Sequence, residues 1–507
     1  MELNKSSIEQ RNSPLDMSAE EFRTVGHDLV DKVADFLATL RQRPVTHGES
    51  PEKIRELLGN ASLPEKGMSA QVLLDEVAPL LFDHSLFNGH PRFWAYITSS
   101  AAPIGMLGDF LAAAVNPNCS MFGLSPIATE IESQTIRWIA EMIGYPTTGD
   151  GILVSGGNMA NFVCFLAARK AKTAGTATND DKVLLCVYAS TETHTWLHKA
   201  VDLFGSGNVV VRWIPTNNRL QIDVRLLREK IEEDMRIGHK PFLVIGTAGS
   251  VSTGAIDPLA DLAAICRELK LWFHVDGAYG GFAAVLPDAH RDLRSLAEAD
   301  SVAVDPHKWL YGPLEAGCVL VRDPKSLTDA FSYHPPYYGF KGEKGEPPRN
   351  YHERGLQNSR GFRALKIWLA LRQVGREGYV RMISDDIRLA QELFHRVEAN
   401  AELEPFTHDL SIVTFRYVPA NLSIEGADRE EYLNNVNTEL LTRLQAGGAA
   451  YLSNALLDKR FVLRACIVNF RTTLSDIDQL PGLVVQLGRE IHAEMKSRQE
   501  KRTTQAT

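Results

Sequence analysis

The sequence predicts an α/β protein in which a large domain is built on a mostly parallel central sheet and a smaller α+β domain follows at the C-terminal end. Three observations predict this fold. Short apolar runs alternate with helical stretches between residues 151 and 322, as strands and crossover helices do in a parallel sheet. The apolar runs at 271–275 and 301–304 each lead to charged residues. Beyond residue 362, helical stretches dominate, and the strands expected there are 411–417 and 461–470.

Composition places the chain among globular proteins. Its 507 residues suffice for two or three domains around a common core. Hydrophobic residues make up 44% and charged residues 23% of the chain, which is typical of a soluble protein. The 63 acidic and 54 basic residues give a net charge of -9, and the one basic cluster is a short stretch at 496–502. Nucleic-acid binding is therefore not expected.

The N-terminal residues and the cysteines indicate a cytoplasmic protein. The first residues are polar and lack the apolar core of a signal peptide. The sequence has no run of about 18 apolar residues that could span a bilayer, so we expect no membrane partner. The six cysteines form no CxxC pair, and most lie within apolar runs. This favours reduced thiols in the core over a disulfide framework or a metal site.

A long amphipathic helix is predicted near the N-terminus. Ser18 and Glu21 have the spacing of a capping box, which satisfies free backbone amides in the first turn. Apolar residues then recur at helical spacing: Phe22, Val25, Leu29, Val33, Phe36 and Leu40. The pattern alone leaves open whether this helix packs on its own domain or covers a partner subunit.

A glycine turn joins a strand to a helix within residues 151–172. Gly156 and Gly157 follow the strand, and Asn158 stands near the start of the helix. Glycines let the backbone approach a phosphate closely, and the amides at a helix N-terminus favour an anion. These three residues are a candidate phosphate cradle, although a bare SGG before a helix is more often only a turn.

Three further strands, at 182–189, 209–214 and 241–246, alternate with helical stretches. The residues after the third strand are small and polar. They stand at the carboxyl end of the sheet, where open α/β folds bind ligands. His194 lies between the first two of these strands, where a lone histidine is usually structural.

Two strand ends bring an acid and an amine to one edge of the sheet. One apolar run leads to Asp276, and the next leads through Asp305 and His307 to Lys308. Burial and neighbouring cations lower the pKa of an amine enough to leave it reactive, so Lys308 suits a covalent bond to an aldehyde. A carboxylate such as Asp276 can pair with a pyridinium nitrogen. Proteins hold pyridoxal phosphate (PLP) as an electron sink in this way.

The segments HVDGAYGG at 274–281 and DPHKW at 305–309 resemble the group II PLP-dependent amino-acid decarboxylases, and most of all their aromatic branch. The likeness extends over roughly residues 16–490. It implies PLP fold type I, as in aspartate aminotransferase, with bound PLP and a homodimer. We therefore expect an N-terminal helical segment at 1–95 that forms the dimer, a large PLP-binding domain at 96–373 and a small domain at 374–507, with the hinge near 374–378.

The resemblance assigns roles at the cofactor. It implies that Lys308 carries the cofactor, that Asp276 keeps the ring nitrogen protonated, and that His194 stacks on the ring and supports catalysis. The expected cofactor-binding residues are Gly156, Gly157, Asn158, His194, Asp276, Ala278, His307 and Lys308.

The resemblance also assigns residues to the substrate. The aromatic and small-polar segment at 90–102, which predicts a loop or short strand, matches a family segment that lines the pocket through Tyr96, Ile97 and Thr98. From the residues alone, a core position for these aromatics is favoured. Arg464 matches the family's arginine that holds the substrate carboxylate, a task that the guanidinium fork performs with two hydrogen bonds.

A Gly-rich and Pro-rich stretch at 332–360 predicts a lid or another long loop. Tyr351 near its end matches a family tyrosine on a mobile loop that reaches into the active site, where a phenol can protonate the substrate carbon. Ser359 stands at a position where plant relatives with serine favour phenolic substrates and those with glycine favour indolic ones. The resemblance therefore favours tyrosine or dopa.

Two positions depart from the family pattern. The family often has a hydroxyl residue where this chain has Val251, and Ser250 or Ser252 could replace the missing contact. Asp305 stands where the aromatic branch commonly has asparagine. A carboxylate near a phosphate is repulsive unless it is turned away or paired.

The expected function is PLP-dependent decarboxylation of an L-amino acid, with the aromatic tyrosine, dopa, phenylalanine and tryptophan favoured as substrates. Three alternatives remain. They are decarboxylation of glutamate or aspartate, an aminotransferase or aldehyde synthase on the same fold, and a protein that has lost catalysis and only binds partners. Aldehyde-forming relatives tend to replace the loop tyrosine or the stacking histidine, so Tyr351 together with His194 favours simple decarboxylation.

Overall fold

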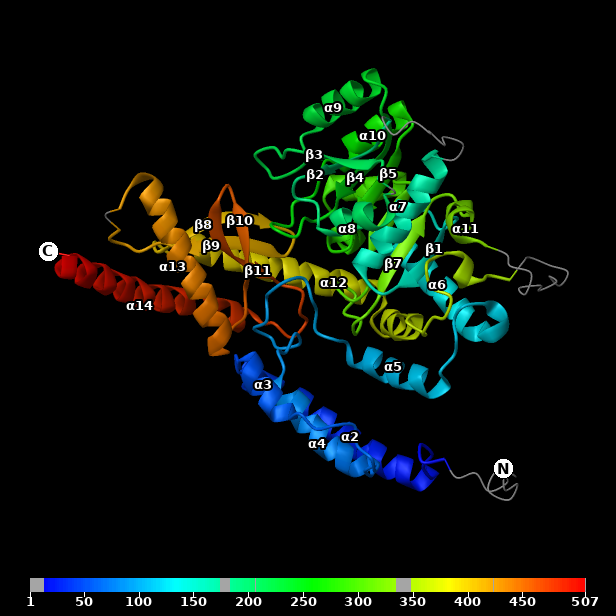
Figure 1. The fold of residues 1–507 in the computed structure, drawn as a ribbon, viewed down its shortest axis with the longest axis horizontal. Coiled ribbons are helices and arrows are strands. Elements are labelled where there is room, and N and C mark those ends of the chain that lie inside the picture. Colours follow the sequence, from blue (N-terminus) through cyan, green and yellow to red (C-terminus); the bar gives the residue numbers. More distant parts are fainter. Residues whose placement is uncertain (1–12, 174–182, 206, 334–347, 423, 507) are drawn as a thin grey trace.

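The chain is described here by a computed structural model that covers residues 13–173, 183–205, 207–333, 348–422 and 424–506 (Figure 1). The N-terminal part is helical, with α2 (Ala19–Thr39), η1 (Leu40–Gln42), α3 (Pro51–Leu58) and α4 (Ala70–His84). Ser18 caps α2 by accepting a hydrogen bond of 3.1 Å from the backbone amide of Glu21, which confirms the predicted helix start. Within the described ranges, no helix is both long and apolar enough to cross a membrane.

A seven-stranded sheet forms the centre of the large domain (Figure 1). Its strands are β1 (Asp150–Val154), β2 (Leu185–Ser190), β3 (Val209–Ile214), β4 (Lys240–Thr247), β5 (Trp272–Asp276), β6 (Ser301–Val304) and β7 (Gly317–Val321). Their order is β1-β7-β6-β5-β4-β2-β3, and only β7 runs antiparallel to its neighbours. The mostly parallel sheet is confirmed, and each predicted strand agrees with the structure to within a few residues wherever the chain is described.

Helices and short 3-10 turns cover this sheet and connect its strands. They are α5 (Pro103–Val115), η2 (Phe122–Leu124), α6 (Pro126–Met142), α7 (Gly157–Thr173), α8 (Trp196–Phe204), α9 (Val224–Arg236), α10 (Leu259–Leu269), η3 (Gly280–Val285), η4 (Arg291–Glu298), α11 (Lys325–Phe331) and η5 (Tyr351–Glu353). Every residue of β1, β2, β5, β6 and β7 is buried, as expected for strands of a parallel sheet that is covered on both faces. All six cysteines are free and buried, which confirms the predicted core thiols.

The C-terminal part contains a second, antiparallel sheet of order β10-β11-β9-β8. Its elements are α12 (Ala364–Glu398), β8 (Leu403–Asp409), β9 (Ile412–Tyr417), α13 (Gly426–Gly447), β10 (Ser453–Leu457), β11 (Arg460–Cys466) and α14 (Leu474–Ala506). The two predicted strands correspond to β9 and to β11, which ends at Cys466 rather than at residue 470. Helix α12 breaks at Gly375, whose φ of 67° is unfavourable for other residues. This break lies in the stretch predicted as the hinge.

Candidate active site

Lys308 lies in the loop that follows β6, at the carboxyl edge of the central sheet. The backbone amide of Asp305 donates a hydrogen bond of 3.2 Å to the carbonyl of Ala278, which ties this loop to the residues after β5. The Lys308 Nζ lies 3.2 Å from the Asp305 Oδ2, and the Lys308 side chain is 17% exposed. The amine is therefore held near the surface of the sheet edge and keeps access to a ligand.

Asp276 ends the neighbouring strand β5 and is buried. The indole Nε1 of Trp196 donates a hydrogen bond of 2.7 Å to its Oδ2, and the amide of Ala278 donates one of 3.2 Å to its Oδ1. In the parallel pairing of β5 with β6, Asp276 lies opposite Ala303. The carboxylate therefore has a fixed orientation at the same edge as Lys308, and each oxygen retains capacity to accept another donor.

His194 belongs to the same group because Trp196, whose indole donates a hydrogen bond to Asp276, also donates a hydrogen bond from its backbone amide to the His194 ring. Partial desolvation, together with the positive charge of Lys308, lowers the pKa of His194 below its usual value. The amide of Trp196 donates a hydrogen bond of 3.2 Å to Nδ1, so the neutral ring carries its proton on Nε2. The structure thus brings together three of the predicted residues, His194, Asp276 and Lys308.

The glycine turn is closely packed against the Lys308 loop. Gly156 has a φ of 91°, and a Cβ there would lie 3.2 Å from the His307 ring. A Cβ on Gly157 would lie 2.6 Å from the Asp305 Oδ2. Only glycine fits this approach, and the turn opens directly into α7, where Asn158 occupies the second position. This arrangement suits an anion at the N-terminus of α7.

His307 and Ala278 support the same edge. The His307 Nδ1 lies 2.6 Å from the carbonyl oxygen of Ala316, and the Ser99 hydroxyl donates a hydrogen bond of 2.7 Å to the His307 carbonyl. Burial lowers the pKa of His307, which favours a neutral ring. These contacts hold the backbone immediately before Lys308.

Sequence reasoning missed Thr247, the last residue of β4. It lies opposite Asp276 in the β4–β5 pairing, and its buried hydroxyl has no hydrogen-bond partner among the described residues. The same holds for the hydroxyl of Thr193, next to His194. A signal for Thr247 was present, since it directly follows a predicted strand at the ligand-binding edge.

An amine, a fixed carboxylate, a glycine cradle and free hydroxyls together fit the aldehyde, ring and phosphate of PLP.

Tyr96, which is predicted to line the substrate pocket, is 54% exposed, whereas Arg464 on β11 is only 2% exposed. Its Nη1 donates hydrogen bonds of 3.0 Å to the carbonyl of Tyr96 and to the hydroxyl of Ser453. Its Nε and Nη2 have no partner within the described part of the chain. Ile97 is buried, and the buried hydroxyl of Thr98 is also without a partner there. The free guanidinium edge has the donor pattern that binds a carboxylate through two hydrogen bonds.

Ser250 does not supply a free hydroxyl in place of the family contact at Val251. Its Oγ lies 3.0 Å from the hydroxyl of Thr253, so it is engaged in its own turn. Val251 itself is exposed. Ser359 is exposed as well, and its predicted contact with the substrate stays a prediction.

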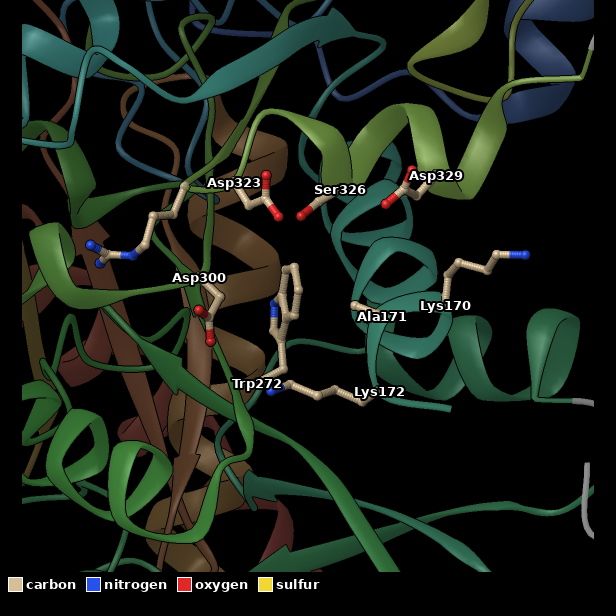
Figure 2. A pocket seen from close by; sticks show the side chains of 9 residues that line it. Lys170, Ala171, Lys172, Trp272, Asp300, Asp323, Ser326 and Asp329 are labelled. Carbon is tan, nitrogen blue, oxygen red and sulfur yellow. The ribbon is translucent and has the colours of Figure 1, made fainter. Parts of the chain in front are cut away.

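A cavity of about 500 Å³ lies at the opposite edge of the sheet (Figure 2). Trp272, the first residue of β5, and Asp300, which precedes β6, face it, and Asp323 and Ser326 at the start of α11 also line it. This edge is formed by the amino ends of the parallel strands. The cavity is therefore separate from the group around Lys308.

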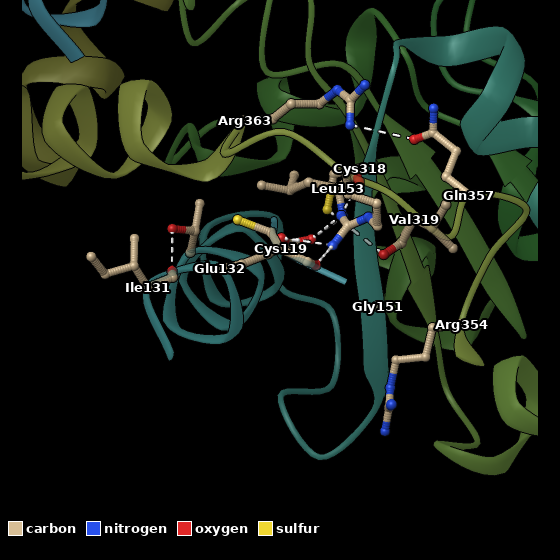
Figure 3. A network of polar contacts seen from close by, with 12 residues as sticks. Cys119, Ile131, Glu132, Gly151, Leu153, Cys318, Val319, Arg354, Gln357 and Arg363 are labelled. Carbon is tan, nitrogen blue, oxygen red and sulfur yellow. Dashed lines mark hydrogen bonds and ion pairs between the residues drawn. The ribbon is translucent and has the colours of Figure 1, made fainter. Parts of the chain in front are cut away.

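The structure does not place Tyr351 on a loop that reaches the active site, so that expectation is corrected. Tyr351 belongs to η5, its side chain is 0% exposed, and the guanidinium of Arg360 lies 4.8 Å from the centre of its ring. Arg360 is held in turn by Glu132 and by the carbonyl of Leu153, two residues that are labelled in Figure 3. Burial raises the pKa of Tyr351, so its hydroxyl keeps its proton. Residues 334–347, which make up much of the Gly-rich and Pro-rich stretch before it, lie outside the described residues.

Comparisons with known proteins agree with this site. Residues 51–418 match the family described as the pyridoxal-dependent decarboxylase conserved domain. An aromatic-L-amino-acid decarboxylase of Bacillus atrophaeus is 34% identical over 478 residues, which cover 94% of this chain and 97% of the relative. A phenylacetaldehyde synthase of Arabidopsis thaliana is 30% identical over 460 residues, which cover 89% of this chain and 92% of the relative.

A solved structure agrees over nearly the whole chain. The crystal structure of Oryza sativa TDC with PLP and tryptamine has a TM-score of 0.86 and 28% sequence identity, and the match covers 95% of this chain and 100% of that chain. The predicted α/β architecture of PLP fold type I is confirmed, and the cofactor is PLP. The matched region contains the strands that lead to Asp276 and Lys308. This chain belongs to the family of pyridoxal-dependent decarboxylases.

Proposed function

We propose that this protein decarboxylates an aromatic L-amino acid to the corresponding amine and carbon dioxide. The observation that carries the proposal is the arrangement of Lys308, Asp276 and His194 at one sheet edge, with the free edge of Arg464 contributed by the second sheet. Two comparisons support an aromatic substrate. The Bacillus atrophaeus relative is named an aromatic-L-amino-acid decarboxylase, and the Oryza sativa structure is of that protein with PLP and tryptamine.

Each residue of the cofactor site has a proposed task. Bound PLP supplies an electron sink for the bond that breaks. Lys308 would bind the aldehyde carbon, and the fixed carboxylate of Asp276 would accept a hydrogen bond from the ring nitrogen and keep that nitrogen protonated. Gly156, Gly157 and Asn158 present the N-terminus of α7 to the phosphate. His194 would lie over the ring and limit the access of water, and its Nε2 would be available to donate a hydrogen bond.

The substrate end depends on Arg464. Its Nε and Nη2 bind the substrate carboxylate, while the bonds from Nη1 to Tyr96 and Ser453 fix the direction of the guanidinium. A fixed carboxylate selects which bond to the α-carbon lies in line with the electron sink. Tyr96, Ile97 and Thr98 line the side-chain pocket, with an aromatic ring and a hydroxyl that suit an aromatic substrate.

A substrate panel tests the proposal. Purified protein with PLP is incubated with tyrosine, dopa, phenylalanine, tryptophan, histidine, glutamate and aspartate, and amine, carbon dioxide, aldehyde and hydrogen peroxide are measured. We expect amine and carbon dioxide in equal amounts from an aromatic substrate. A second candidate is aldehyde synthesis, because the Arabidopsis thaliana relative is a phenylacetaldehyde synthase. Aldehyde and peroxide as main products, or faster turnover of glutamate or aspartate, would contradict the proposal.

Tyr351→Phe is expected to keep kcat within about threefold of the wild type, because a group with no contact to reacting atoms contributes little to the chemical step. The hydroxyl is buried and has no hydrogen-bond partner among the described residues, so its removal also leaves the fold intact. Steady-state kinetics on the best substrate of the panel measures the effect. A fall of about a hundredfold or more, typical of a lost general acid, would restore Tyr351 as the proton donor.

We also propose that the protein is a homodimer in the cytoplasm. The helices α2 and α4 lie side by side, away from the two sheets (Figure 1), and large apolar residues of α2, α4 and α5 are exposed. Those more than 45% exposed include Phe22, Val30, Leu73, Leu81, Leu107, Phe110, Leu111 and Val115. Apolar surface of this extent marks an interaction site. Light scattering that gives the mass of a single chain at micromolar concentration would contradict the dimer.

A further inference from the structure

We propose that the carboxylate of Asp305 lies in the phosphate cradle, where it pairs with Lys308 in the absence of cofactor. When cofactor binds, this carboxylate weakens the binding of the cofactor phosphate. The wild-type protein then holds its cofactor mainly through the covalent bond to Lys308 rather than through the phosphate. This inference rests on the assignment of PLP as the cofactor and does not depend on which amino acid is the substrate.

Asp305 is buried, and one of its carboxylate oxygens has no hydrogen-bond partner among the described residues. The residue is 2% exposed, and its backbone amide is fixed on the carbonyl of Ala278. Its Oδ2 lies 3.2 Å from the Nζ of Lys308 and 3.7 Å from the Nε2 of His307. Its Oδ1 has no hydrogen-bond partner in the described part of the chain. One oxygen of a buried carboxylate is thus left without a donor, which is costly unless the site has another use.

The carboxylate of Asp305 lies against the first residue of α7. A Cβ on Gly157 would lie 2.6 Å from Oδ2 and 3.2 Å from both Oδ1 and Cγ of Asp305. Gly157 is the first residue of α7, a helix of 17 residues. The carboxylate therefore lies against the helix end that would receive the phosphate, where the backbone amides favour negative charge. Two anions, the carboxylate and the phosphate, compete for the same positive end.

Cofactor binding would reduce the number of hydrogens that the Lys308 Nζ can donate to Asp305. A free ammonium offers three hydrogens to the Asp305 carboxylate at 3.2 Å. Once Nζ is bonded to the aldehyde carbon, it carries at most one hydrogen, so Asp305 loses part of its pairing while a phosphate of nearly two negative charges enters. Like charges in a buried site repel each other strongly. An uncharged side chain at position 305 removes this repulsion.

The experiment separates the phosphate from the covalent bond. Apo-protein is titrated with pyridoxamine 5'-phosphate and with pyridoxamine, neither of which has an aldehyde to react with Lys308, and Kd is measured by calorimetry. Asp305→Asn is expected to lower the Kd of pyridoxamine 5'-phosphate by about tenfold or more, because a repulsion between close like charges is removed. The Kd of pyridoxamine is expected to change by less than about twofold, because this probe lacks the phosphate.

Two further variants keep the test decisive. Asp305→Ser also removes the charge, with a smaller side chain, and replaces Asp305→Asn if that variant fails to fold. The same changes in both Kd values are expected for it. Asp329→Asn, on the exposed part of α11, makes the same change in net charge and leaves both Kd values unchanged. Unchanged or weaker binding of the phosphorylated probe to Asp305→Asn, or equal shifts for both probes, would overturn the inference. Failure of the wild type to bind PLP at all would instead overturn the cofactor assignment.

Discussion

Lys308→Ala is expected to lower kcat by about a thousandfold or more, because the residue proposed to bind the cofactor aldehyde and to release the product is removed. The absorbance band that PLP acquires when it is bonded to the protein is expected to disappear as well. Borohydride treatment of the wild type fixes the cofactor on Lys308, and mass spectrometry of the peptide that contains Lys308 locates it. The same treatment leaves the variant unlabelled.

Lys308→Ala is expected to fold with a lower free energy of unfolding, because the buried carboxylate of Asp305 loses the ammonium group that pairs with it. The loop itself stays fixed by backbone bonds at Asp305 and by the contacts of His307, which the substitution leaves in place. Lys230→Ala on α9 is the matched control, because Lys230 forms ion pairs at the molecular surface and is expected to have wild-type kcat and absorbance. A Lys308→Ala protein that kept its activity and its absorbance band would refute the cofactor site.

The sequence predicted the parts of the site that follow short buried strands. Asp276 and Lys308 stand just beyond the runs that form β5 and β6, so strand periodicity and the geometry of a parallel sheet were sufficient to place them on one edge. Gly156 and Gly157 were predicted as a turn between a strand and a helix, and the structure places that turn against the Lys308 loop. These features depend on neighbours close in the sequence.

Contacts between distant segments could not be predicted in this way. The resemblance matched Tyr351 to a family tyrosine on a mobile loop, and the Gly-rich and Pro-rich stretch around it predicted a long loop, but a buried arginine covers its ring. That arginine, Arg360, pairs with Glu132, which is 228 residues away in the chain. Nothing in the local pattern of either residue reveals its partner. The free edge of Arg464 also depends on Tyr96 and Ser453, which are distant in sequence.

Arg360→Met is expected to lower the free energy of unfolding by about 3–5 kcal/mol, because it leaves the carboxylate of Glu132 buried without a counter-ion. The Arg360 Nη2 donates hydrogen bonds of 2.5 Å to the Glu132 Oε1 and 2.6 Å to the carbonyl of Leu153, and Nη1 donates one of 2.8 Å to the carbonyl of Cys119 (Figure 3). Both charged side chains are essentially fully buried. Urea unfolding of the variant and of the wild type measures the difference in the free energy of unfolding. The comparison uses the same dependence of this free energy on urea concentration for both proteins.

A double-mutant cycle separates the burial of the lone charge from the loss of packing. If the unpaired Glu132 carboxylate causes most of the loss, Arg360→Met combined with Glu132→Leu is more stable than Arg360→Met alone, because no buried charge remains. The exposed pair Arg228 and Glu268 is the matched control, and Arg228→Met is expected to change the free energy of unfolding far less than Arg360→Met does. Glu132 also accepts a hydrogen bond of 3.0 Å from the amide of Leu153, close to Gly156. A double variant that regains stability but binds PLP more weakly would therefore show that this buried pair also positions the phosphate cradle. Equal losses of unfolding free energy in the single and double variants would exclude the unpaired charge as the cause of the loss.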